Sequence, residues 1–69
     1  MQDTWEAKVA CRDGAGRKRE AKVVITDTAD VALITPPGDA AVWNPNDVKA
    51  LVETIWAAQL EALTRRGLR

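Results

Sequence analysis

The sequence predicts an α+β domain: an antiparallel three- or four-stranded β-meander with one C-terminal α-helix packed across one face. Three observations predict it. Two segments with alternating polarity flank a glycine-containing loop, a short apolar segment stops at two prolines, and a helix start is followed by a long periodic apolar pattern. The 69 residues make a single domain. We expect strands at about 4–12, 19–26 and 31–35, a further candidate strand at 40–43, and a helix at about 45–66.

The first two strands are predicted from alternation. Trp5, Ala7, Val9 and Cys11 share one face of the first strand, and Ala21, Val23 and Ile25 share one face of the second. A two-residue turn at Asp13-Gly14 would set Val9 opposite Lys18 and mix the two faces. A five-residue loop, 13–17, sets Val9 opposite Ala21, Ala7 opposite Val23 and Trp5 opposite Ile25. We therefore predict the longer loop.

The third strand brings Val31 and Leu33 beside Ile25 and Val23, and it ends at Pro36-Pro37 because proline cannot donate to a ladder. The segment 40–43 either pairs as a fourth edge strand or runs extended into the helix. A two-residue Gly38-Asp39 turn puts Trp43 beside Ile34 on the outer face. A three-residue loop starting at Pro37 puts it beside Leu33 on the inner face, and both registers stay open.

The helix start is well defined, since Asn44 is a good N-cap, Pro45 suits the first position and Asp47 favours the positive helix end. The apolar residues that follow cover roughly 200° of the helix, against the ~100° needed to pack on one sheet. We expect one interior formed by Trp5, Val9, Val23, Ile25, Leu33, Leu51 and Ile55. The rest of the arc requires a second partner.

Composition excludes several classes of function. Ten basic residues balance ten acidic ones, so no overall field attracts nucleic acid or an anionic membrane. With one cysteine and no histidine, we expect no disulfide within the chain, no metal site and no cofactor. Residues 1–6 lack a basic segment followed by an apolar one, and no apolar run reaches membrane length. We expect a cytoplasmic protein without a membrane or small-molecule ligand.

Features that resemble catalytic motifs have simpler structural interpretations, so we expect no enzyme and no catalytic residues. Cys11 lies in phase with the buried face and has no histidine to activate it, which favours a small buried side chain. The Asp13–Gly16 segment joins two strands and lacks the Lys-Ser/Thr ending of a phosphate loop. The turn carboxylates are assigned structural roles, and they include Asp27, Asp30, Asp39 and Asp47.

A basic cluster at one hairpin end gives an alternative function. Arg12, Arg17, Lys18 and Arg19 lie within 12–19, and a basic two-stranded ribbon can contact phosphates. No aromatic or amide side chain is interleaved for reading bases, and Asp13 and Glu20 dilute the charge. A nucleic-acid-binding accessory protein is therefore the alternative, and a solvated loop is the simpler interpretation.

The leading hypothesis is a small non-enzymatic protein-binding or regulatory module that acts through apolar surface, as a homodimer or with a protein partner. A phage-type inhibitor of a host protein would share this physics. The candidate interface residues lie on the helix flank and on the outer sheet face, and they are Val52, Trp56, Leu60, Leu63, Val24 and Ile34.

The segment 23–62 also carries a resemblance. It contains a Val-Val-Ile-Thr-Asp strand end, a Pro-Pro-Gly turn and a Trp-Asn-Pro-Asn-Asp helix start before a Leu/Ile helix. This order resembles small actinobacterial proteins of largely unknown function and the BldB-like short regulators. The Trp-Arg-Lys-Ser-Ser opening of that family is absent, and Trp5-Glu6-Ala7-Lys8 stands in its place. The resemblance implies a non-enzymatic, protein-binding regulatory role.

Overall fold

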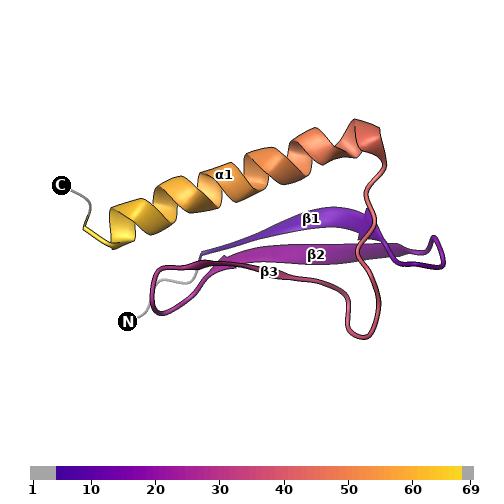
Figure 1. The fold of residues 1–69 in the computed structure, drawn as a ribbon, viewed down its shortest axis with the longest axis horizontal. Helices are drawn as coiled ribbons and strands as arrows, with labels where there is room; N and C mark the ends of the chain where they lie inside the picture. Colours follow the sequence, from indigo (N-terminus) through magenta and orange to yellow (C-terminus); the bar gives the residue numbers. More distant parts are fainter. Residues whose placement is uncertain (1–4, 68–69) are drawn as a thin grey trace.

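The computed structural model describes residues 5–67 and confirms the predicted α+β fold. Three strands, β1 (Glu6–Arg12), β2 (Lys18–Ile25) and β3 (Val31–Ile34), form an antiparallel sheet in the order β1-β2-β3. A 3₁₀ turn, η1 (Pro45–Asp47), leads into the helix α1 (Val48–Arg65), which lies across one face of the sheet (Figure 1). The described chain therefore forms two layers. Thr4, where the predicted first strand begins, lies outside the described residues.

The predicted registers are confirmed wherever the ladder includes them. Val9 lies opposite Ala21 and Ala7 opposite Val23, so the loop between β1 and β2 has the five residues 13–17. Val23 lies opposite Leu33, and Ile25 opposite Val31. Because side chains alternate between the faces of a strand, these registers put Val9, Val23 and Leu33, one residue from each strand, on the face that meets α1.

The core is small and is formed around Val9, Val23 and Ala58. Trp5, Trp43 and Leu51 are partly buried against this cluster, and Val23 is the one large side chain that is fully buried in the described part of the chain. The helix contributes Ala58 and Ala62 as its buried residues. Small alanines let the helix backbone approach the sheet closely, so they decide which side of α1 faces inward.

The segment 40–43 corrects both predicted registers for Trp43. Its one bridge is with β1 and not with β3: Arg12 N–H donates to Val42 O at 3.0 Å, and Val42 N–H donates to Arg12 O at 2.8 Å. The chain leaves β3, passes the end of β1 and then enters the helix (Figure 1). Trp43 consequently packs on the core from the β1 side.

The predicted interior is correct for most of its residues and wrong for two. Val9, Val23 and Ile25 are buried, and Trp5 and Leu51 are half-buried. Ile55 is instead 37% exposed and Leu33 is 42% exposed. Leu33 lies on the predicted face, but its strand is at the edge of the sheet. Ile55 lies beside the alanine row that contacts the sheet, because α1 is rotated further toward Ala58 than the sequence indicated.

Both ends of the helical segment are fixed by side chains. Asn44 caps η1 as predicted, because its side-chain oxygen accepts the Asn46 N–H at 2.9 Å. At the other end, Arg66 Nε donates to Ala29 O at 3.2 Å, and its guanidinium pairs with Asp30. These contacts tie the end of α1 to the turn between β2 and β3. Within residues 5–67, no helix has the length and apolar character needed to cross a membrane.

Candidate functional site

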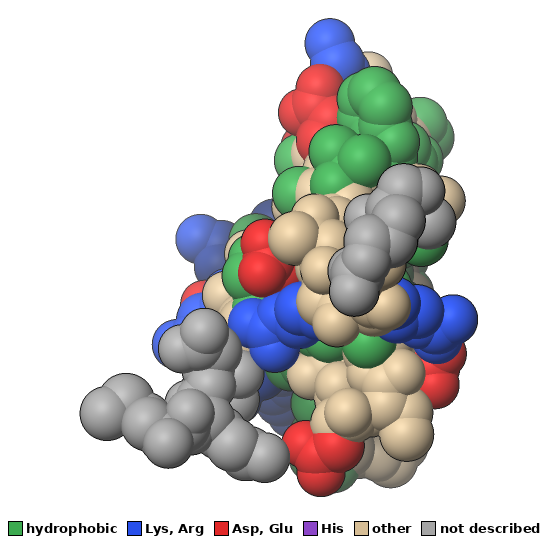
Figure 2. Space-filling view, turned by 90° about the vertical axis from the view of Figure 1, so that its left-hand side faces the viewer, with side chains coloured by type: hydrophobic (Ala, Val, Ile, Leu, Met, Phe, Trp, Pro, Cys, Tyr) green, Lys and Arg blue, Asp and Glu red, His purple; other side chains and the backbone are tan. Residues whose placement is uncertain are grey.

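One flank of α1 is apolar and open to solvent. Trp56 is 62% exposed, and Val52 and Leu60 are each more than half exposed. They follow one another at helical spacing, so they form a continuous stripe along the helix. Figure 2, seen from the C-terminal end of the helix, shows hydrophobic side chains gathered over α1 in the upper part of the molecule.

The direction of α1 decides which strand this flank borders. The helix begins beside the end of β1, where Val42 bridges Arg12, and ends beside Asp30 at the β2–β3 turn. It therefore runs antiparallel to β1. In a right-handed helix with this direction and with Ala58 against the sheet, the row that contains Val52 lies on the side of β3.

The inner face of β3 is open on the same side. Leu33 is 42% exposed, whereas Val9 on the inner face of β1 is 6% exposed, because Trp43 and Trp5 also pack on the core cluster that contains Val9. The helix flank and the inner face of β3 together make one surface. We call it the open apolar face, and it consists of Val31, Leu33, Val48, Val52, Ile55, Trp56 and Leu60.

The sequence-derived interface residues fall on two separate surfaces. Val52, Trp56 and Leu60 lie on the exposed flank of α1, and Leu63 is half-buried at its rim. Val24 and Ile34 lie on the outer face of the sheet, away from the helix, where Ile34 is 51% exposed and Val24 is half-buried. The fold does not bring these two sets together.

Four residues of the open apolar face are absent from the sequence-derived set, namely Val31, Leu33, Val48 and Ile55. A signal for the strand residues was available. The last strand of a meander is an edge strand, and one helix cannot cover all three strands of a sheet to the same depth. No comparable signal predicted that Ile55 would be exposed, because the width of the apolar arc does not indicate which part of it faces the sheet.

The hairpin loop is organised by a buried carboxylate. Asp13 is almost completely buried, and its Oδ1 accepts the N–H groups of Ala15 and Arg17, both at 2.9 Å. Its Oδ2 accepts Arg17 Nε at 3.0 Å and lies 3.3 Å from Arg19 Nε. Two guanidinium groups of the predicted nucleic-acid contact set are thus paired with one carboxylate. Arg12 donates to Gly16 O at 2.9 Å, and Lys18 is exposed.

The same contacts lower the pKa of Asp13. The backbone N–H of Arg17 stabilises the ionised carboxylate most, and the Ala15 N–H and the Arg17 guanidinium add to it, while burial acts in the opposite direction. Asp13 therefore stays ionised at neutral pH. Its negative charge neutralises part of the positive charge of the basic cluster in 12–19.

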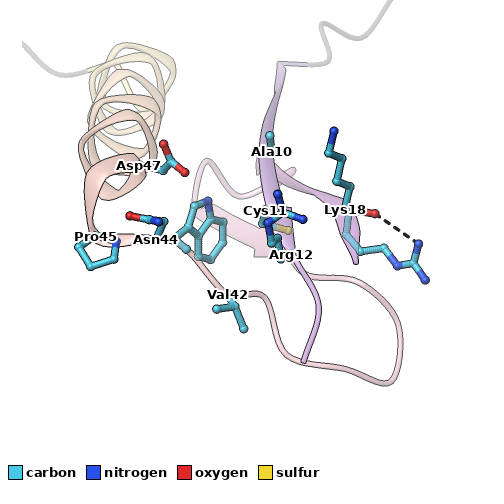
Figure 3. Close-up of a pocket in the computed structure, with 10 residues that line it drawn as sticks. Ala10, Cys11, Arg12, Lys18, Val42, Asn44, Pro45 and Asp47 are labelled. Carbon is cyan, nitrogen blue, oxygen red and sulfur yellow. Dashed lines mark hydrogen bonds between the residues drawn. The ribbon is translucent and has the colours of Figure 1, made fainter. Parts of the chain in front are cut away.

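An open groove lies between β1 and the start of the helical segment (Figure 3). Its volume is about 650 Å³, and Arg12 and Lys18 lie on the strand side while Asn44 and Asp47 lie on the other. Trp43 also lines it, and the indole N–H of Trp43 is buried without a hydrogen-bond acceptor in the described part of the chain. The groove thus combines cations, one carboxylate and an indole edge.

Cys11 lines the groove but is buried as predicted, with its side chain on the inner face of β1. The chain contains no histidine that could activate the thiol. In residues 5–67, no three potential metal ligands gather in one place.

Comparison with protein-family models, with curated protein sequences and with solved structures gives no match for this chain.

Proposed function

We propose that this protein is a small non-enzymatic protein-binding or regulatory module that acts as a homodimer through the open apolar face. The exposed flank of α1 around Trp56 carries the proposal. A contiguous apolar patch on a small protein marks an interaction site, and tryptophan is among the residues that contribute most to binding energy.

The balance between buried and exposed apolar residues supports a partner. In the described part of the chain, the buried hydrophobic residues are mostly small, and they include Ala21, Ala58 and Ala62. Most of the large aliphatic side chains of α1 are exposed instead. A domain of this size has little stability to spare, and the usual reinforcements are disulfides, metals or association. Because the chain has one cysteine and no histidine, association is the remaining reinforcement of these three.

A double substitution on the flank tests the proposal. We expect light scattering to give the parent a mass near twice the 7.5 kDa of one chain, and Trp56→Gln, Leu60→Glu a mass near 7.5 kDa with the helix content retained. The matched control is Ala50→Gln, Ala57→Glu, which places the same polar residues at exposed positions on the other side of α1. The control should remain dimeric.

Other outcomes would give the open apolar face a different role or none. A monomeric parent whose Trp56 is accessible to a quencher would redirect the proposal to a foreign protein partner, as for a phage-type inhibitor. A monomeric parent whose Trp56 is shielded would contradict an interface at this face. Salt-dependent binding of DNA or RNA, with a slope set by the phosphate contacts, would instead favour the 12–19 hairpin.

A further inference from the structure

The strand β3 has one edge without a neighbour. Thr26 N–H donates to Asp30 O at 2.8 Å, which fixes the phase of the β2–β3 ladder. Because hydrogen-bonded pairs alternate in an antiparallel ladder, Ala32 and Ile34 bond to β2, while the N–H and C=O groups of Leu33 point away from it. In the described residues nothing pairs with this edge.

The two edges of the sheet are not equivalent. The edge at β1 carries Glu6, Lys8 and Arg12, and Val42 crosses its end. Charged side chains on an edge strand discourage pairing with another chain. The edge at β3 has the sequence Val31-Ala32-Leu33-Ile34, without a charge or a proline. The edge without a charged side chain is therefore the one next to the open apolar face.

Two copies of β3 are complementary to each other. In an antiparallel pair with Leu33 opposite Leu33 of the second copy, the two leucines exchange N–H···O=C bonds, and Val31 does the same with Thr35. A twofold axis normal to the sheet keeps the inner faces of both copies on one side. Both helices then lie on that side.

The same arrangement closes the open apolar face. The exposed fractions of its residues set an upper limit of roughly 600 Å² of apolar surface per copy, or about 1,200 Å² for a pair, that this arrangement can bury, and about 1,200 Å² is the lower end of specific interfaces. The middle strands of the two copies are three strand spacings apart, roughly 14 Å, wider than the 8–10 Å typical of packed helices. Side chains on the β3 side of α1, such as Val52 and the large Trp56, point toward that space.

Charge does not oppose the pairing. The chain has no net charge. Asp30, which directly precedes β3, already forms an ion pair with Arg66 within one copy. Two identical surfaces can therefore approach without repulsion.

We propose, on the basis of the homodimer proposed above, that two copies join edge to edge through β3. The twofold axis passes between Leu33 of one copy and Leu33 of the other. The two sheets become one continuous sheet, and the flanks of the two helices face each other above the seam.

Hydrogen exchange of single amides tests this pairing. In the parent, the Leu33 amide should exchange at least about tenfold more slowly than in the monomeric Trp56→Gln, Leu60→Glu variant, because the second copy binds it. The Lys8 amide points to the free edge of β1 and is the matched control, which should exchange rapidly in both proteins.

The exchange rates and the mass together distinguish a dimer paired through β3 from a dimer paired elsewhere and from a monomer. A dimer in which Leu33 and Lys8 both exchange rapidly would associate through the helices alone and would overturn the edge pairing only. A dimer with a slow Lys8 amide would place the seam at β1 and would also overturn it. A monomeric parent would contradict the homodimer itself.

Disulfide trapping tests the register independently. In a Cys11→Ala background, Leu33→Cys should cross-link two copies rapidly on mild oxidation, because directly opposite Cα atoms lie about 5.5 Å apart, within disulfide range. Ala32→Cys is the matched control. In this register position 32 lies opposite Ile34 of the second copy and too far from position 32 of that copy to form a disulfide. Cross-linking of Ala32→Cys alone, or of neither variant, would overturn the proposed axis.

Discussion

At the residue scale, Asp13 makes the hairpin loop dependent on pH. Because its pKa is lowered in the folded protein, its contribution to stability is present at neutral pH and is lost as the pH falls below about 4. We expect Asp13→Asn to melt at a lower temperature than the parent at pH 7, and the difference to shrink toward pH 2–3. Thermal unfolding followed by circular dichroism measures it. A difference that is constant over this range would contradict the assigned role.

Gly14 takes part in a close contact between two loops. Its N–H donates to Asp39 Oδ1 at 3.2 Å, and a Cβ at this position would lie 2.8 Å from the same oxygen. Gly14→Ala should therefore destabilise the protein by about 1 kcal/mol, the value of one hydrogen bond. If the contact is the cause, adding Gly14→Ala to Asp39→Ala should have no further effect in urea unfolding. Additive losses would show that Gly14 acts elsewhere.

At the scale of elements, the orientation of α1 predicts an order of mutational effects. Ala58 is 0% exposed, so Ala58→Leu overpacks the helix–sheet contact and should cost about 1–3 kcal/mol or more. Ile55 is partly exposed, so Ile55→Ala should cost less than about 2 kcal/mol, below the range for a fully buried isoleucine. Urea unfolding compares the two in the monomeric Trp56→Gln, Leu60→Glu background, where no second copy covers Ile55. The reverse order would mean that Ile55, and not Ala58, faces the sheet.

The sequence predicts the strand registers well because alternation allows few solutions. Placing Val9 opposite Ala21 keeps Ala7, Val9 and Cys11 on the same face as Ala21 and Val23, and a shift by one residue would put the two sets on opposite faces. The path of 40–43 was not predictable in the same way. Val42 makes a single bridge to Arg12, and that contact depends on how the chain crosses the end of the sheet. Local turn geometry contains no information on such a crossing.

The candidate site was predictable only in part. The wide apolar arc correctly indicated that Trp56 and Leu60 have no place in the core. It did not indicate that Ala58 would face the sheet, because small and large apolar residues count equally in a periodic pattern. The exposure of Leu33 follows from its edge strand and from the helix position together, and neither is visible in the sequence of β3 alone.

At the scale of the whole molecule, the structure is a two-layer fold with one open side. The covered side, at β1 and β2, holds Val9 and Val23. The open side, at β3, exposes large apolar side chains on both layers at once. Burial of this side against a second copy would give each chain the core that it lacks, so folding and association should be linked.

The dependence of the melting temperature on protein concentration tests this linkage most directly. If the native state is a dimer and the unfolded state is not, mass action stabilises the native state as concentration rises. Over a hundredfold increase in concentration, the Tm of the parent should rise by several degrees, while that of Trp56→Gln, Leu60→Glu should not change. A parent Tm that is constant over the same range, and equal to that of the variant, would contradict the account.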